Sequence, residues 1–323
     1  MQDCTQVTLP PQLADLWQGC GDATETGHTA VIKLGMRLDL LQGRLHGPAL
    51  AQGKSHDRRV VEYLPTLPTG SLLLADLGFF SLPALAASAA RKVHFITRIQ
   101  AGTFLYDQLG TRWSLATFLA AQPAGPVDCW IDLGATQRLR CRLIAVRVPV
   151  WVANERRRRM KEEARRRGQA VTAERLQLAD WTVLATTVPV ETLTIQEVLV
   201  LARARWQIEL LIKLWKSQGE IDQSRSEQPD RILCELYAKL IAMVVQHWIL
   251  LTGCWTAPDK SLVKATATIR DFARCLAPAL AYPTRLRHRL TDLVTALRAG
   301  CRMNTRSTKP NAYQFLLNPA LAP

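Results

Sequence analysis

The feature that most constrains the fold is a short, uninterrupted apolar run, LLLA at residues 72–75, which stops at Asp76. A continuous run, unlike an alternating one, is typical of a strand that is covered on both faces of a sheet. Gly78 follows, and residues 79–90 are rich in Ala and Leu, as in a helix. The run therefore predicts a strand-to-helix unit of the α/β class, with the carboxylate of Asp76 at the end of a central strand.

A second strand is predicted over residues 29–40. Apolar side chains occupy every second position there, and Lys33, Arg37 and Asp39 lie between them. This period of two indicates a half-buried strand. Residues 93–190 contain several more strand-like runs, rich in β-branched and aromatic residues and separated by Gly and Pro. We therefore expect a β-rich insertion over 93–190.

Within that insertion, residues 155–169 read ERRRRMKEEARRRGQ and consist mainly of good helix formers. The acidic and basic side chains of such a segment can pair along one helix. The pattern favours a solvated helix, with contact to DNA as the alternative.

A longer helix is predicted after Thr194. Thr194 and Glu197 have the spacing of a capping box, and the helical pattern continues to about residue 216, before Gly219. Four charged residues fall at i, i+4, i+8 and i+11, within roughly an 80° sector of one face. They are Arg205, Glu209, Lys213 and Lys216. Taken alone, such a stripe is usually solvated, but apolar neighbours on the same helix indicate that it also packs beside a cleft or at the surface.

The charge of the chain points to a polyanionic partner. The formal net charge is +14, and clustered Lys and Arg gain free energy by displacing counterions from phosphates. Charge alone leaves RNA-binding, membrane-surface and merely soluble proteins open. The eight cysteines show no zinc-like spacing. The longest apolar stretch, residues 240–251, is interrupted by Gln246 and His247 and is too short to span a bilayer, so we expect a cytoplasmic protein with no membrane partner.

The segment RARWQIELLIKLWKS at residues 203–217 resembles the Tyr-Arg-Glu-Lys signature of transposases in the insertion-sequence-four family. These proteins belong to the Asp-Asp-Glu superfamily, which has a ribonuclease H-like core. The spacing of the signature is matched by Arg205, Glu209 and Lys216, whereas the Tyr position is Ala202.

The resemblance extends towards the beginning of the chain. LLLADLGFF is similar to the strand that carries the family's second catalytic aspartate, here Asp76, and DCT at residues 3–5 resembles the motif of the first, here Asp3. The likeness covers about residues 1–250. It implies an α/β fold, a ribonuclease H-like mixed sheet flanked by helices, with a β-rich insertion between the second Asp and the Glu. The parts expected are a core over 1–92, the insertion over 93–190, the second core part with the Glu helix over 191–252, and a C-terminal helical segment over 253–323.

The resemblance also implies an active site, made of Asp3, Asp76 and Glu209 as ligands of two Mg²⁺ or Mn²⁺ ions. In-line displacement at a phosphodiester is assisted by two divalent ions about 3.5–4 Å apart, one activating the attacking oxygen and one stabilising the leaving oxygen. Carboxylates suit this chemistry because Mg²⁺ is hard and prefers oxygen ligands.

DNA contacts follow from the same likeness. Trp181 in WTVLATT resembles the tryptophan that stacks on a nucleotide flipped out of the duplex, and Arg98 in HFITRIQ resembles an insertion-domain arginine near the DNA. The basic residues of the signature helix would neutralise phosphates, and they are Arg205, Lys213 and Lys216.

The implied partners are double-stranded DNA, as the terminal inverted repeats of the element and as target, and a second copy of the chain on the paired ends. The implied place is the bacterial cytoplasm, at the nucleoid. Family members carry a DNA-recognition region before the first aspartate, whereas Asp3 is the third residue here, so we expect a truncated copy. Two alternatives stay open: a non-catalytic DNA-binding remnant, and a ribonuclease H-like nuclease that does not join strands.

Overall fold

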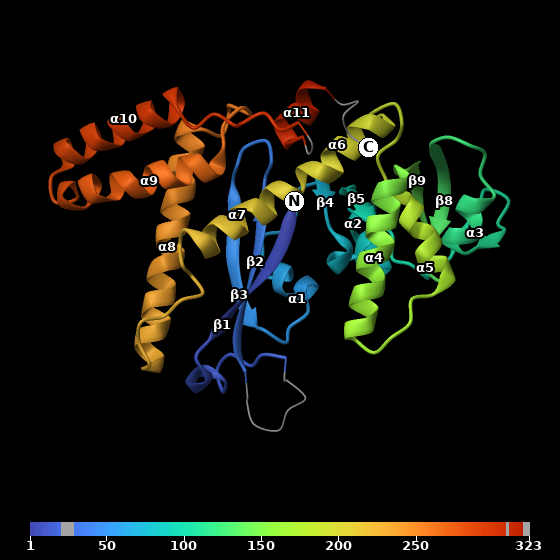
Figure 1. Cartoon of the computed structure of the whole chain (residues 1–323), viewed down its shortest axis with the longest axis horizontal. Coiled ribbons are helices and arrows are strands. Elements are labelled where there is room, and N and C mark those ends of the chain that lie inside the picture. Colours follow the sequence, from blue (N-terminus) through green and yellow to red (C-terminus); the bar gives the residue numbers. More distant parts are fainter. Residues whose placement is uncertain (21–28, 308–309, 319–323) are drawn as a thin grey trace. The chain divides into compact units, whose positions relative to one another are not determined.

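The computed structural model describes residues 1–20, 29–307 and 310–318, and it divides into two compact units (Figure 1). The first unit combines Met1–Pro65 with Trp206–Gln314, and the second comprises Thr66–Arg205 and the described residues from Phe315 onward. The positions of the two units relative to each other are not determined, so each is described by itself.

The first unit contains a three-stranded antiparallel sheet in the order β1-β2-β3. Its strands are β1 (Gln2–Leu9), β2 (Ala30–Leu38) and β3 (Leu45–Gln52). The strand predicted over 29–40 is confirmed, but it is buried on both faces and not only on one. Helix α1 (Asp57–Glu62) covers the second face, where the buried Lys33 pairs with Asp57 at 2.7 Å. Gly35 permits this close approach, because a Cβ there would lie 2.6 Å from the side chain of Val60.

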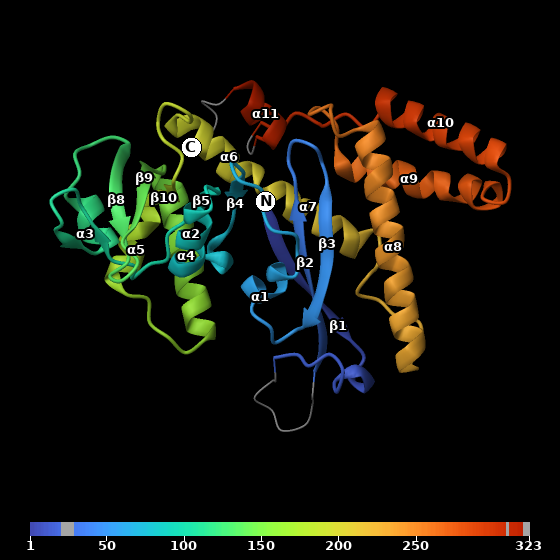
Figure 2. The same cartoon turned by 180° about the vertical axis from the view of Figure 1, so that it is seen from behind.

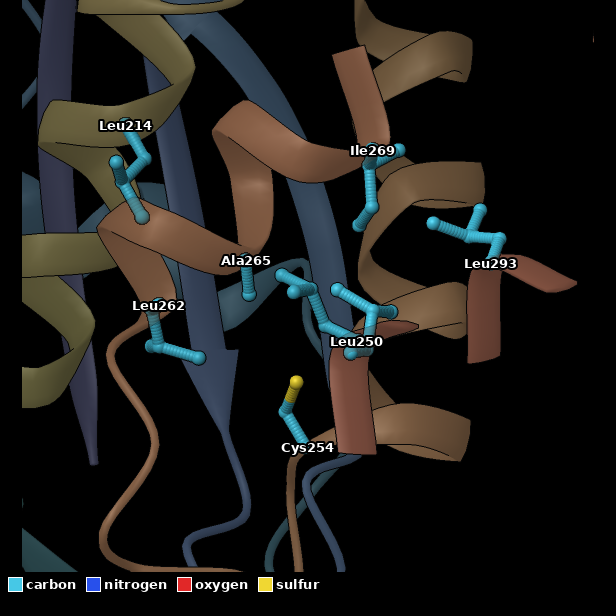
Figure 3. Packing of buried hydrophobic residues seen from close by; sticks show 8 residues of the cluster. Leu214, Leu250, Cys254, Leu262, Ala265, Ile269 and Leu293 are labelled. Atoms are coloured by element: carbon cyan, nitrogen blue, oxygen red, sulfur yellow. The ribbon is translucent and has the colours of Figure 1, made fainter. Parts of the chain in front are cut away.

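The rest of the first unit is helical. Its helices are α7 (Trp206–Ser217), α8 (Pro229–Gly253), α9 (Leu262–Leu276) and α10 (Pro283–Ala299), whereas α11 (Ala312–Leu317) is divided between the two units after Gln314. One apolar cluster joins the first four of these helices (Figure 3). It consists of Leu214, Leu250, Cys254, Leu262, Ala265, Ile269, Leu293 and Leu297. The unit therefore has a helical core of its own beside the sheet.

Helix α8 is the one described helix that is long and apolar enough to cross a bilayer by length and composition. The core helices of other proteins meet the same criterion. Two polar side chains of α8 are buried and bond within their own unit: Gln246 donates to Thr266 at 3.3 Å, and His247 Nε2 lies 2.6 Å from the carbonyl oxygen of Gly43. The first contact joins α8 to α9, and the second docks α8 on the turn between β2 and β3.

The second unit is organised around a seven-stranded mixed sheet with the order β4-β5-β10-β9-β8-β6-β7. Its strands are β4 (Leu72–Leu74), β5 (His94–Arg98), β6 (Leu105–Tyr106), β7 (Arg112–Trp113), β8 (Val127–Leu133), β9 (Leu139–Arg147) and β10 (Trp181–Thr186). Only β4 and β5 are parallel, and α2 (Leu82–Ala90) connects them. The predicted α/β class with a mixed sheet flanked by helices is confirmed. In this sheet the strands of the expected insertion continue directly from β4. The four-part division of the chain stays a prediction, and residues 21–28, 308–309 and 319–323 of its first and last parts lie outside the described residues.

The other helices of the second unit are α3 (Leu115–Ala120), α4 (Val150–Arg166), α5 (Ala173–Gln177) and α6 (Ile195–Ala204). The charged segment forms α4, and its acids and bases pair along the helix as expected. The capping box of Thr194 and Glu197 is present at the start of α6. The helical span predicted from there to about residue 216 is present, but as two helices and not one, because Arg205 interrupts it between α6 and α7 while its backbone keeps the right-handed helical conformation.

Candidate active site

Asp76 lies immediately beyond the carboxyl end of β4. Leu74 is paired with Ile96 of the parallel neighbour β5, so Asp76 and Arg98 leave the sheet at the same edge. The Asp76 carboxylate accepts a hydrogen bond from the backbone N–H of Gly78 at 3.0 Å and so caps the following turn. The second carboxylate oxygen of Asp76 accepts no hydrogen bond from the described residues, so none of them would compete with a metal ion for it.

A cavity of about 1010 Å³ opens at this edge, and all the residues that line it belong to the second unit. Its charged lining is mostly basic. The arginines of the lining are Arg98, Arg156, Arg159, Arg175, Arg203 and Arg205. The acids are Asp76 and Glu174. Because six guanidinium groups face two carboxylates, the cavity favours anionic ligands.

Trp181 begins β10 and also lines the cavity. Its side chain is 7% exposed, and the guanidinium of Arg147 lies 4.6 Å from the centre of its ring. A nucleobase that stacks on this ring has to share or displace the Arg147 contact. The stacking role of Trp181 therefore stays a prediction, with Arg147 as the residue that would move.

Asp3 and Glu209 both belong to the first unit, on β1 and in the first turn of α7. The two elements are in contact, since Lys216 Nζ donates to the carbonyl oxygen of Gln6 at 2.7 Å. From that contact, Asp3 lies about 10 Å back along the strand and Glu209 about 10 Å back along the helix. In Figures 1 and 2, α7 crosses the three-stranded sheet, and the N-terminal end of β1 lies beside its first turns.

The local environment of these two carboxylates suits negative charge. Glu209 occupies the first turn of α7, where the helix dipole stabilises an anion. Asp3 Oδ1 accepts the backbone N–H of Cys4 at 2.8 Å. On the other face of the strand, the Cys4 thiol donates to the carbonyl oxygen of Asp57 in α1, so Asp3 points away from α1.

The basic residues of the signature are distributed over both units. Arg205 closes α6 and lines the cavity, whereas Lys213 and Lys216 belong to α7. Lys213 Nζ lies 4.0 Å from the centre of the exposed Trp206 ring, and this contact positions the ammonium group at the surface. The predicted stripe of four residues on one continuous helix is thus divided at Arg205.

The structure brings Asp3 and Glu209 to contacting elements of one unit, and it brings Asp76, Arg98, Trp181 and Arg205 to one cavity of the other. Asp76 belongs to a different unit from Asp3 and Glu209, so the meeting of the three carboxylates stays a prediction. Among the residues that the structure describes, there is no group of three or more His, Cys, Asp or Glu side chains able to hold a metal ion.

Four arginines of the cavity were not singled out from the sequence, namely Arg156, Arg159, Arg175 and Arg203. Arg156 belongs to the charged segment interpreted mainly as a solvated helix, and Arg203 precedes the signature arginine by two residues. Periodicity gives a usable signal, because Arg156, Arg159 and Met160 recur at helical spacing and all three line the cavity.

Comparison with known proteins identifies the family of the chain. The family described as "Transposase DDE domain" matches residues 3–245. The transposase for insertion sequence element IS231F of Bacillus thuringiensis subsp. israelensis is 26% identical over 98% of this chain and 71% of its own length. The transposase for IS1151 of Clostridium perfringens is 26% identical over 78% of this chain and 57% of its own length. The putative transposase InsL for IS186A of Escherichia coli (strain K12) is 30% identical over 52% of this chain and 48% of its own length.

The family match covers both aspartates and the glutamate, and it extends over most of both units. Members of this family cut DNA and depend on divalent metal ions, which fits the carboxylate of Asp76 at the end of a strand beside a basic cavity. The chain belongs to the DDE transposase family of insertion sequences.

Proposed function

We propose that this chain cleaves DNA strands at the ends of an insertion sequence and joins them to target DNA, with Asp3, Asp76 and Glu209 as ligands of two Mg²⁺ or Mn²⁺ ions. The observation that carries the proposal is the position of Asp76, at the end of β4 and on the border of a cavity with six arginines. A metal-binding carboxylate next to a strongly basic cavity is what a phosphodiester substrate requires.

The residues around the site have different proposed roles. When bound, the ions would activate the attacking oxygen and stabilise the leaving oxygen. Arg98 and Arg205 hold phosphate oxygens by charge-assisted hydrogen bonds at the cavity. Lys213 adds positive charge on α7, beside Glu209 on the same helix.

The proposed DNA substrates are the terminal inverted repeats of the element and a target duplex, and the proposed assembly is a dimer on paired ends in the cytoplasm at the nucleoid. Support comes from the net charge of +14 and from relatives whose names state that they act for insertion sequence elements. Joining both ends of the element to one target duplex requires two active sites, and this favours a second copy of the chain.

The experiment uses the purified chain, Mg²⁺ or Mn²⁺, and labelled duplexes that carry the ends of its own element. Asp3→Asn, Asp76→Asn and Glu209→Gln should each reduce cleavage by at least about 100-fold, because even the loss of a group that only supports a ligand costs about 10–100-fold. Asp230→Asn, which removes an exposed carboxylate in the first turn of α8, serves as the matched control and should retain the full rate.

Two results would count against the proposal. Unchanged cleavage by the Asp76→Asn variant removes Asp76 from the active site. Cleavage without any strand transfer into a supercoiled target leaves a nuclease in place of a transposase. Manganese binding, followed by electron paramagnetic resonance, gives a second measurement that does not depend on turnover, and each of the three variants should weaken it.

A further inference from the structure

The basic cavity of the second unit holds charges that its own acids do not balance. Of its arginines, Arg159 pairs with Glu155 at 2.8 Å, and this pair neutralises one guanidinium group. Among the described residues, Arg156 donates only to neutral oxygens. Arg98 is exposed, and no carboxylate of the described residues lies within ion-pair distance of it. Arg98 and Arg156 therefore carry positive charge that no ion pair of the described residues compensates.

Arg156 is held firmly at the centre of this charge. Its Nη1 donates to the carbonyl oxygen of Trp181 at 2.8 Å, and its Nη2 donates to Thr182 Oγ1 at 3.1 Å. These bonds fix the guanidinium against the first residues of β10 but leave its charge intact. A fixed donor loses little conformational entropy when it binds an anion.

The charges of three arginines act on one another. The pKa of Arg156 is lowered by burial and by the charge of Arg98, and the pKa of Arg203 is lowered by burial and by the charge of Arg156. Each lowered pKa reports an environment that disfavours the positive form. An anion placed between the three groups would remove this cost, because guanidinium groups bind phosphate oxygens in a bidentate manner.

We propose that Arg156 and Arg203, together with Arg98, form a binding site for a phosphate group of the DNA strand in the cavity beside Asp76. The choice of DNA as the ligand rests on the proposed function, and the arginine cluster itself does not. Two further features favour a nucleotide over a smaller anion: the cavity is at the upper end of the range of about 300–1,000 Å³ that is usual for ligand sites, and the Trp181 ring lines it.

The test is a binding measurement in EDTA, so that it does not depend on metal or turnover. A fluorescent duplex that carries the end of the element is titrated with wild-type protein and with Arg156→Gln, Arg156→Lys and Arg203→Gln, over about 50–200 mM salt. Arg158→Gln is the matched control, because Arg158 lies on the same helix but is 60% exposed and pairs with Glu155 and Glu162.

Arg156→Gln and Arg203→Gln should each weaken binding by about 10-fold. Each should also reduce the slope of log affinity against log salt by about 0.9, the value for one phosphate contact. Arg156→Lys should keep the wild-type slope, and Arg158→Gln should match the wild type in both measurements. If these binding results are obtained but the protein does not cleave DNA, the proposed function is refuted and the phosphate site is not.

Three outcomes would overturn the phosphate site. Equal affinity and slope for Arg156→Gln and Arg158→Gln would mean that the cavity does not contact DNA. Equal losses of affinity for Arg156→Gln and Arg156→Lys, with an unchanged slope, would mean that Arg156 acts only by holding β10. The third outcome uses inorganic phosphate, added at constant ionic strength. If phosphate raises the thermal midpoint of the wild type but not of Arg156→Gln, while the two proteins bind DNA equally well, the site takes a free ion and not DNA.

Discussion

Replacing Arg142 with Met should destabilise the second unit more than any change to a surface arginine of the same strand. Arg142 lies on β9 between β10 and β8 and is 1% exposed. Its Nε and Nη2 donate to the two carboxylate oxygens of Asp128 at 2.5 and 2.6 Å, and its Nη1 donates to the carbonyl oxygen of Leu193 at 2.6 Å. One side chain thus ties two strands to the segment that leads into α6.

The magnitude follows from burial. Removing one partner of a buried ion pair costs about 3–5 kcal/mol, because the other charge stays in the interior without its partner. Asp128 keeps 22% of its side-chain surface exposed and regains some hydration, which places the expected loss near the lower end, at about 3 kcal/mol. That is a large part of the stability of an ordinary domain, which is about 5–15 kcal/mol.

The assay is urea unfolding, with Arg140→Met as the control. Arg140 lies two residues away on β9 and pairs with Asp132 of β8 at 3.4 Å, but 51% of its side chain is exposed. Such exposed pairs contribute about 0–1 kcal/mol. The double variant Arg142→Met with Asp128→Leu should recover much of the loss, because no isolated charge remains. Equal losses for Arg142→Met and Arg140→Met would refute the reasoning.

Two further predictions concern titratable groups. Burial lowers the pKa of His247, and the bond with Gly43 offsets this only in part. As the pH falls, the unfolded chain therefore protonates His247 before the folded chain does, and the free energy of unfolding should decrease below about pH 6.5. In urea titrations, His247→Gln should flatten this pH dependence. The control His288→Gln, at an exposed histidine, should leave it unchanged. Burial raises the pKa of the Cys141 thiol to about 12 and that of Cys254 to about 11. A thiol reagent should therefore modify neither of these two thiols in the folded protein. Mass spectrometry should find the label first on the exposed cysteines, which are Cys20, Cys234 and Cys275. Rapid labelling of Cys141 in the native state would contradict its buried position.

The sequence predicted those elements that have a strong local signal. The capping box at Thr194 and the alternation over residues 29–40 each became the expected element, because hydrophobic period and capping chemistry act over a few residues. The apolar run before Asp76 became a strand, but the expected central position is wrong, because β4 is the terminal strand of the sheet that the structure describes. The alternation gave the strand but not its burial. Lys33 reads as a solvent-facing residue, and only the contact with Asp57, 24 positions later, places it in the interior.

Other features depend on tertiary structure and leave little local trace. The break at Arg205 falls within a helical pattern that continues on both sides, so the residue pattern alone favoured one helix. Arg156 looks like its neighbours in a run of four arginines. Its difference from Arg158 is the direction in which the helix turns it, towards β10 rather than towards the pairing acids of α4. Packing between elements decides such cases.

Strand β4 has only three residues and is the terminal strand of its sheet, so within the described part of the second unit β5 alone holds it by strand hydrogen bonds. Openings that break few ladder bonds cost less free energy than global unfolding, and terminal strands are the first to fray. Asp76 is attached to this rim of the sheet. Its carboxylate should thus lose its place under mild denaturation while the remainder of the sheet is still protected from amide exchange. The ion binding proposed for Asp76 and the folding of the unit should then be lost in separate steps.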